Sequence, residues 1–336
     1  MKALVIAAPR CASIEDVPYP NPKAGEVTIK VHQVGICGTD FHIFEGEFIS
    51  PYPIIPGHEF SGEIFEVGEG VTQFTPGDRV SADPSLFCGE CEYCLTHRGN
   101  QCSNWNGLGN TVNGSMAEYV AVPARNVVKI RDSMSFAEAA FIEPVACVVH
   151  GINRLNMKLG DRVLLFGAGA MGQMLIQSIV KSGASELVVV DVSTDKLHMA
   201  LENGATMGVL NHDVNRVLRT GRYERGFDVV VDVTGIPAVI ETALDFIGPT
   251  GKYLQFGVAP TNAKVNVNPF KIYNRDWTIL GSMAINYTFL PALEWIQAQR
   301  VDVLPLVSKT ISLEEVPQLL SRPKDPSLFK VQIKLT

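Results

Sequence analysis

The chain has 336 residues, of which 46% are hydrophobic and 19% are charged, and its formal net charge is −7. This length favours two domains, each large enough to bury a core of its own. The acidic balance, without a basic cluster, argues against nucleic acid or an anionic membrane as a partner, and no apolar run reaches the ~18 residues of a membrane span.

The cysteines and the first residues of the chain indicate the cellular compartment in which the protein is expected. Four of the seven cysteines fall within residues 88–102, which suits metal ligation in a reducing compartment better than a secreted disulfide framework. The opening apolar run ends at Pro9 and Arg10, too early for a signal peptide, and predicts a first strand. We therefore expect a cytoplasmic protein.

The first 145 residues predict a β-rich domain. Short apolar runs of strand length are separated by turn signals such as Thr75-Pro-Gly-Asp78. The expected strands cover residues 26–34, 61–67, 79–82 and 116–122. Cys11 in this region is interpreted as core packing, as are Cys147 and His150 on a predicted helix further on.

From about residue 146 strands and helices alternate, which predicts an α/β domain with a parallel, doubly wound sheet. Its strands are expected near 162–166, 186–191, 207–210, 228–233, 252–257 and 277–282. The tail, with a helix at 290–300 and a strand at 328–334, is too short for a third domain and is expected to complete the first. The predicted domains are therefore 1–145, 146–285 and a return segment 286–336.

Four cysteines form the most specific motif, with the spacing Cys88-x2-Cys91-x2-Cys94-x7-Cys102. Four thiolates on one loop can close a tetrahedral zinc site that leaves no position for substrate, so the predicted role is structural. An iron–sulfur cluster is the alternative. His97 lies inside the loop, but four cysteines already fill the site, and we expect it at the surface.

Two residues nearby have the side chains that a catalytic zinc uses. Cys37 follows a predicted strand and His58 precedes another, each in a loop flanked by glycines. A catalytic zinc takes about three protein ligands and leaves one position open for water or substrate. Taken singly, however, either residue is more often ordinary packing.

A glycine motif follows the apolar run that starts at Val163, with the pattern Gly167-x-Gly169-x-x-Gly172. Strand, glycine turn and helix together bind the pyrophosphate of a dinucleotide. The next predicted strand ends at Asp191, 19 residues after Gly172, where a carboxylate accepts hydrogen bonds from ribose hydroxyls and repels a 2′-phosphate. No arginine follows within 192–196, so NAD is favoured over NADP.

In this order the motifs resemble the zinc-dependent medium-chain alcohol dehydrogenases, especially the polyol branch with sorbitol and arabinitol dehydrogenases. The stretches that carry the resemblance are Gly35-Ile-Cys-Gly-Thr-Asp40, Gly57-His-Glu-Phe-Ser-Gly62, the four-cysteine loop and Gly167-Ala-Gly-Ala-Met-Gly172. The resemblance implies a GroES-like β-rich catalytic domain, a Rossmann domain and an active-site cleft between them.

By the same resemblance, Cys37 and His58 bind the catalytic zinc, and a glutamate replaces the second cysteine of an alcohol dehydrogenase site. Glu143, which precedes Pro144, resembles the polyol form, and Glu59 competes with it. Adjacent side chains of an extended chain point to opposite faces, so His58 and Glu59 share one metal only if the loop kinks. We expect both glutamates near the zinc, and the sequence leaves open which one binds it directly.

The family pattern also gives roles to two polar residues after Cys37. Thr39 is expected to accept the proton of the substrate hydroxyl, and His42 to pass it to solvent. The catalytic residues are thus predicted to be Thr39, His42 and Glu59. The predicted cofactor-binding residues are Gly167, Gly169, Ala170, Met171, Gly172, Asp191, Val192, Lys196, Thr234 and Gly257.

The reaction that follows is transfer of a hydride from a secondary hydroxyl of a sugar alcohol to NAD, which gives a ketose. Sorbitol dehydrogenases often carry a substrate-binding arginine in the segment matching residues 281–286, and none stands here, which weakens sorbitol itself. Another secondary alcohol, such as a vicinal diol or threonine, is one alternative, and a dinucleotide-binding protein without dehydrogenase activity is another. The family further implies a homodimer or homotetramer.

Overall fold

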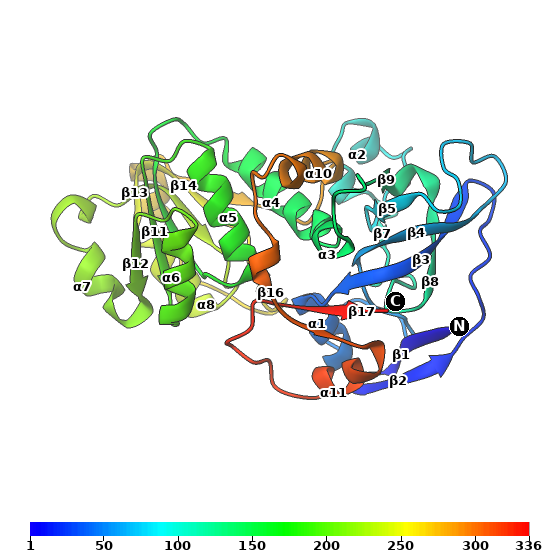
Figure 1. The fold of residues 1–336 in the computed structure, drawn as a ribbon. Helices are drawn as coiled ribbons and strands as arrows, with labels where there is room; N and C mark the ends of the chain where they lie inside the picture. The colour runs from blue at the N-terminus through cyan, green and yellow to red at the C-terminus, as the bar shows by residue number, and fades with distance from the viewer. Residues whose placement is uncertain (336) are drawn as a thin grey trace. The chain divides into compact units, whose positions relative to one another are not determined.

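The computed structural model describes residues 1–335, which form two compact units (Figure 1). The first comprises Met1–Ala146, Ile285–Ala298 and the chain from Val303 onward; the second comprises Cys147–Ala284 and Gln299–Asp302. Gln299–Asp302 return to the second unit, whereas the sequence pattern assigns all of 286–336 to the first. Side chains of the second unit hold this stretch, because Lys181 Nζ donates to the carbonyl of Gln299 at 3.1 Å and Gln177 binds the backbone of Asp302.

The first unit is built on a mixed sheet in the order β16-β17-β3-β4-β5-β9, with β8 also paired to β3. The last strand is inserted beside an early one, since Gln332 of β17 pairs with Gly35 of β3. Apolar side chains of these strands and of β1 form one buried core. The strands of this unit are β1 (Lys2–Ala8), β2 (Cys11–Asp16), β3 (Glu26–Gly35), β4 (Glu59–Val67), β5 (Arg79–Ala82), β6 (Ser85–Leu86), β7 (Asn106–Gly107), β8 (Tyr119–Pro123), β9 (Val127–Lys129), β16 (Val307–Ile311) and β17 (Lys330–Lys334).

A short helix, α1 (Gly38–Glu45), follows β3 directly, where the sequence predicts only a loop. Cys37 caps it in extended conformation, and its backbone N–H donates to Asp40 Oδ2 at 2.7 Å. Gly46 ends the helix in the left-handed region, with φ of 81°. The other helices of this unit are α2 (Glu92–Leu95), α3 (Phe136–Ala139), α10 (Phe289–Gln297) and α11 (Val316–Leu320), while α4 (Ile142–Leu155) runs from the first unit into the second.

The second unit has a parallel six-stranded sheet in the order β12-β11-β10-β13-β14-β15. This is the strand order of a doubly wound sheet. From β10 the chain fills the sheet in one direction to β12, and from β13 it fills the sheet in the opposite direction to β15. The order confirms the predicted fold class. Nearly continuous apolar runs form the central strands, and consecutive residues of β10 and β11 are buried, as in a sheet covered on both faces. The strands are β10 (Arg162–Phe166), β11 (Glu186–Asp191), β12 (Met207–Leu210), β13 (Phe227–Asp232), β14 (Ile247–Gln255) and β15 (Thr278–Gly281); the helices are α5 (Ala170–Lys181), α6 (Thr194–Glu202), α7 (Val214–Leu218), α8 (Pro237–Leu244) and α9 (Pro269–Asn274).

Cys11, Cys147 and His150, all interpreted as core packing, differ in burial. His150 is buried and Cys147 is half-buried, both on α4. Cys11 is exposed, so its interpretation was wrong. It lies in β2, which pairs only with β1 in a separate two-stranded sheet and keeps no buried residue of its own. No helix within residues 1–335 is both long and apolar enough to cross a membrane.

Candidate metal centres and nucleotide-binding loops

Cys37, His58 and Glu59 come together at one end of the first unit's sheet. One ligand atom from each lies within 4.8 Å of the other two. Gly57, with φ of 96°, turns the chain sharply just before His58, and β4 begins at Glu59. This kink lets two consecutive side chains reach one cluster. His58 and Glu59 are almost fully buried, and Cys37 is partly exposed.

The chemistry of this trio fits a zinc ion. A thiolate, an imidazole and a carboxylate are the ligands that zinc takes, at about 2.0–2.3 Å each, so two ligands of one ion lie at most ~4.5 Å apart. His58 Nδ1 faces Asp40 Oδ1 at 3.8 Å, and neither atom has a hydrogen-bond partner among the described residues. Burial alone lowers the pKa of His58, but the negative charges of Cys37, Asp40 and Glu143 outweigh it and raise the pKa. Such an accumulation of anionic groups is what a bound cation balances.

Glu59 has a buried cationic partner that the sequence analysis does not identify. Lys330 Nζ donates to both carboxylate oxygens of Glu59 at 2.8 Å, and to the carbonyl of Ile36 at 3.3 Å. Burial lowers the pKa of Lys330, but the charges of Glu59 and Cys37 reverse the shift and raise it. In β17 the polar residues Lys330 and Gln332 alternate with apolar ones, which is the pattern of a solvent-facing side, yet both are buried, so the sequence pattern gives no signal for Lys330.

The second candidate glutamate, Glu143, lies in the first turn of α4 and is buried. Its charge raises the pKa of both His58 and Lys330, so it is close to the same cluster. Its carboxylate is nevertheless not among the three ligand atoms that lie within 4.8 Å of one another. The geometry therefore favours Glu59 over Glu143 for a direct bond to a metal held by Cys37 and His58.

The two predicted proton-transfer residues lie on α1. The Thr39 hydroxyl is 3.7 Å from Cys37 Sγ, beside the cluster. His42 lies one turn further along, and its side chain is 45% exposed. His42 Nδ1 is 2.8 Å from Glu47 Oε2, so Glu47 can hold the imidazole with Nδ1 protonated and leave Nε2 to exchange protons.

The four cysteines of the 88–102 loop converge. Three of their Sγ–Sγ separations are 3.5 Å, 3.9 Å and 3.9 Å. A tetrahedral ion with sulfur bonds of ~2.3 Å requires separations of ~3.8 Å, so these distances fit a single ion better than a cluster of several. Backbone N–H groups of Cys94 and Ser103 lower the pKa of Cys91 to about 6, which favours the thiolate. His97 is exposed, as predicted.

The chain at 286–287 packs against this loop. Asn286 Nδ2 donates to the carbonyl of His97 at 3.0 Å, and the hydroxyl of Tyr287 donates to the carbonyl of Cys94 at 3.4 Å. The ring of Tyr287 also meets the ring of Phe87 edge-on. The four-cysteine loop is thus anchored by residues nearly 200 positions away in the sequence.

In the second unit the glycine motif forms the turn between β10 and α5. Gly167 has φ of 102°, and a Cβ at Gly172 would lie 2.0 Å from the carbonyl oxygen of Gly167, so both positions require glycine. Asp191 ends the adjacent strand β11 and binds this turn, because its Oδ2 accepts from Ala168 N at 2.7 Å and its Oδ1 from Ser193 N at 2.9 Å. Ala170 and Met171 begin α5, Val192 is 80% exposed, and Lys196 lies on α6 nearby.

A buried carboxylate organises the neighbouring strand ends. Asp232, at the end of β13, accepts from the Thr234 hydroxyl at 2.6 Å, from Gly235 N at 2.8 Å and from Gln255 Nε2 at 2.9 Å. A Cβ at Gly257 would lie 2.4 Å from Gly235 N, so Thr234 and Gly257 are close together. The predicted cofactor residues therefore gather at the carboxyl ends of β10, β11, β13 and β14, where doubly wound sheets bind ligands.

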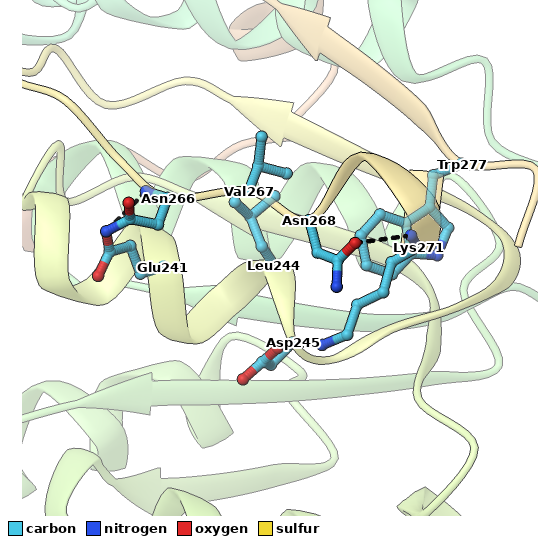
Figure 2. Close-up of a pocket in the computed structure, with 8 residues that line it drawn as sticks. All are labelled: Glu241, Leu244, Asp245, Asn266, Val267, Asn268, Lys271 and Trp277. Atoms are coloured by element: carbon cyan, nitrogen blue, oxygen red, sulfur yellow. Dashed lines mark hydrogen bonds and ion pairs between the residues drawn. The ribbon is translucent and has the colours of Figure 1, made fainter. Parts of the chain in front are cut away.

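A pocket of about 410 Å³ between α8 and α9 contains none of the predicted site residues (Figure 2). Asp245 and Trp277 place it near the amino ends of β14 and β15, opposite to the glycine turn. Its charged groups are paired: Lys271 Nζ with Asp245 at 2.7 Å, and Glu241 with the backbone and side-chain nitrogens of Asn266. We assign it no role.

Two family descriptions match the chain: an alcohol dehydrogenase GroES-like domain over residues 23–132 and a zinc-binding dehydrogenase domain over 170–298. D-arabinitol dehydrogenase 1 of Uromyces fabae is 32% identical, with 99% of this chain and 97% of that protein aligned. Sorbitol dehydrogenase of Bacillus subtilis is 33% identical, with 96% and 93% aligned. A solved structure of a zinc-binding dehydrogenase from Sinorhizobium meliloti, bound to NADP, has a TM-score of 0.96 at 31% identity, covering 99% of this chain and 98% of that one.

Proposed function

The chain belongs to the zinc-binding alcohol dehydrogenases, and on that premise we propose that it oxidises a secondary hydroxyl of a sugar alcohol to a ketone, with NAD as hydride acceptor. The observation that carries the proposal is the trio of Cys37, His58 and Glu59, which offers a metal three ligands. Likeness to enzymes named for arabinitol and sorbitol supports a polyol as the substrate.

Cys37, His58 and Glu59 would hold the catalytic zinc, with Glu143 close by. A zinc ion bound there would supply Lewis-acid chemistry, which makes a hydroxyl group more acidic. Thr39 then accepts the proton of the substrate hydroxyl and gives up its own hydroxyl proton toward His42, since this hydroxyl lies beside Cys37. His42 releases that proton to solvent, and Glu47 orients the imidazole for this step.

The preference for NAD rests on Asp191. Its carboxylate is fixed beneath the glycine turn, and a 2′-phosphate on the adenosine ribose would meet its negative charge. The related Sinorhizobium meliloti structure holds NADP, so the two cofactors must be compared directly in this protein. Thr234 and Gly257 are proposed to line the nicotinamide half of the cofactor.

We further propose a homodimer or homotetramer in the cytoplasm. β15 is an edge strand of the second unit's sheet, and its Ile279 is 47% exposed, as an edge that pairs with a second copy would be. The spacing of the four cysteines, which suits metal ligation better than a disulfide framework, fits a reducing compartment.

Metal content and NAD reduction on a panel of pentitols and hexitols, before and after chelation, test the proposal. The panel also includes 2,3-butanediol and threonine, which represent the two other secondary alcohols considered. We expect about two zinc ions per chain, with turnover of a polyol that is lost when one ion is removed and regained when it is restored. Two bound zinc ions without turnover of any polyol would rule out the proposed substrate class, and turnover of threonine or butanediol alone would replace it.

A further inference from the structure

Lys330 is a buried cation that the proposed reaction does not use. An ammonium group has three donors, and here all three have acceptors: the two carboxylate oxygens of Glu59 and the carbonyl of Ile36. The Lys330 side chain is 6% exposed and that of Glu59 is 2% exposed, so water does not compete for either group. The pair is therefore held in one geometry.

The position of the Glu59 carboxylate is also limited by close packing on β3. A Cβ at Gly35 would lie 2.2 Å from Glu59 Oε2, so the carboxylate fills the space that the missing side chain leaves on β3. Gly35 and Glu59 are directly paired residues of β3 and β4, and Lys330 comes from β17 on the other side of β3. Three strands thus determine where this carboxylate lies.

The same carboxylate is one of the three groups that face a common point with Cys37 and His58. Lys330 and a metal ion at that point are both cations, and they draw on the same two oxygens. A carboxylate whose oxygens both accept from an ammonium group donates less charge to a metal and cannot turn both oxygens toward it.

We propose that Lys330 is a positioning residue, which restrains Glu59 and thereby weakens the hold of the site on its catalytic zinc. The restraint limits Glu59 to a single oxygen and preserves the open coordination position that a substrate needs. This inference deepens the proposed function and rests on the catalytic zinc site within it.

Release of zinc from the fully loaded protein into a colour-forming chelator, without substrate, tests this role. The Lys330→Met variant loses the cation, and Glu59 becomes free to bind the metal fully; we expect the catalytic zinc to leave roughly tenfold more slowly than in the wild type. Lys330→Arg retains the charge and should stay close to the wild type. Lys309→Met, on the neighbouring strand β16 and half exposed, is the matched control and should release zinc at the wild-type rate. The four-cysteine zinc gives an internal reference in every variant.

Release from Lys330→Met at the wild-type rate, or faster, with the four-cysteine zinc retained, would overturn the inference. If Lys330→Met does not fold, Lys330→Gln removes the charge and keeps two N–H donors, and the same two outcomes apply to it. The measurement needs no turnover. If the wild type oxidises no polyol but Lys330→Met still releases zinc more slowly than the wild type, this inference holds and only the polyol proposal is contradicted. A wild type that binds zinc at the four cysteines alone would overturn both.

Discussion

Replacing Gly35 by alanine tests the packing that surrounds Glu59. The added Cβ would lie 2.2 Å from Glu59 Oε2, where ordinary contact begins at about 3.4 Å, so the carboxylate must retreat by roughly 1.2 Å. A shift of that size lengthens a 2.8 Å bond to Lys330 to about 4 Å, beyond hydrogen-bond range. Because Gly35 has ordinary backbone angles, the effect is steric and involves no backbone strain.

The cost follows from the bond that is lost. A hydrogen bond to a charged group contributes about 1.5–3 kcal/mol, and a buried charge left wholly without its partner costs up to ~5 kcal/mol. For a unit of this size, 1.5–3 kcal/mol corresponds to a fall in melting temperature of roughly 3–12 °C. We expect that fall in the zinc-free protein, where no metal can hold the displaced carboxylate.

Differential scanning calorimetry of Gly35→Ala beside Gly38→Ala measures this difference. Gly38 lies on the other side of Cys37, and a Cβ there meets only Lys324 Nζ at 3.7 Å, an ordinary contact. Alanine in the first turn of α1 also favours the helix, so Gly38→Ala should melt at or slightly above the wild type. Equal melting temperatures for the two variants would show that the Glu59 niche is not constrained as described.

Three further predictions concern the relay, the cofactor and pH. Thr39→Ala should lower kcat by about 100-fold or more without changing the Kd of NADH, and Thr39→Ser should restore most of it; an unchanged kcat removes Thr39 from the relay. Asp191→Ala should weaken NADH binding and narrow the preference over NADPH in fluorescence titrations, because the carboxylate and its bonds to Ala168 and Ser193 are lost; an unchanged ratio excludes Asp191 from the adenosine site. Burial raises the pKa of Asp83 from 3.8 to about 6, so folding favours its protonated form, and stability falls as pH rises between those values. Asp83→Asn should abolish about 1–3 kcal/mol of that fall in urea unfolding at pH 4.5 and pH 7, and an equal pH dependence in both proteins contradicts this assignment.

The strands of the second unit are predictable from the sequence because their physical signal is local. Residues 162–166, 186–191 and 207–210 are short, largely apolar runs bounded by turn residues, and each forms the strand expected. The glycine turn follows from the same stretch, because Gly167 and Gly172 meet within six residues of chain. The four cysteines likewise converge within one loop.

What the sequence does not reveal depends on contacts between distant residues or on weak local patterns. The sequence does not predict α1, because its eight residues have little apolar periodicity and its N-cap is a cysteine whose backbone N–H is bound by Asp40. The sequence does not predict the contact of Lys330 with Glu59, because the two residues are 271 positions apart and no local periodicity indicates such a pairing. The choice between Glu59 and Glu143 also depends on tertiary packing, since the kink at Gly57 brings Glu59 beside His58.

The insertion of β17 beside β3 has a consequence for biosynthesis. The second unit is nearly continuous in sequence, so most of it can fold while the ribosome is still making the chain. The first unit cannot finish its sheet until β17 has been made, and Glu59 stays without its counter-charge until Lys330 arrives. During synthesis the nascent chain can therefore carry a nearly finished nucleotide-binding unit while its metal site is incomplete, and the surroundings of Glu59 are completed only when β17 joins the sheet.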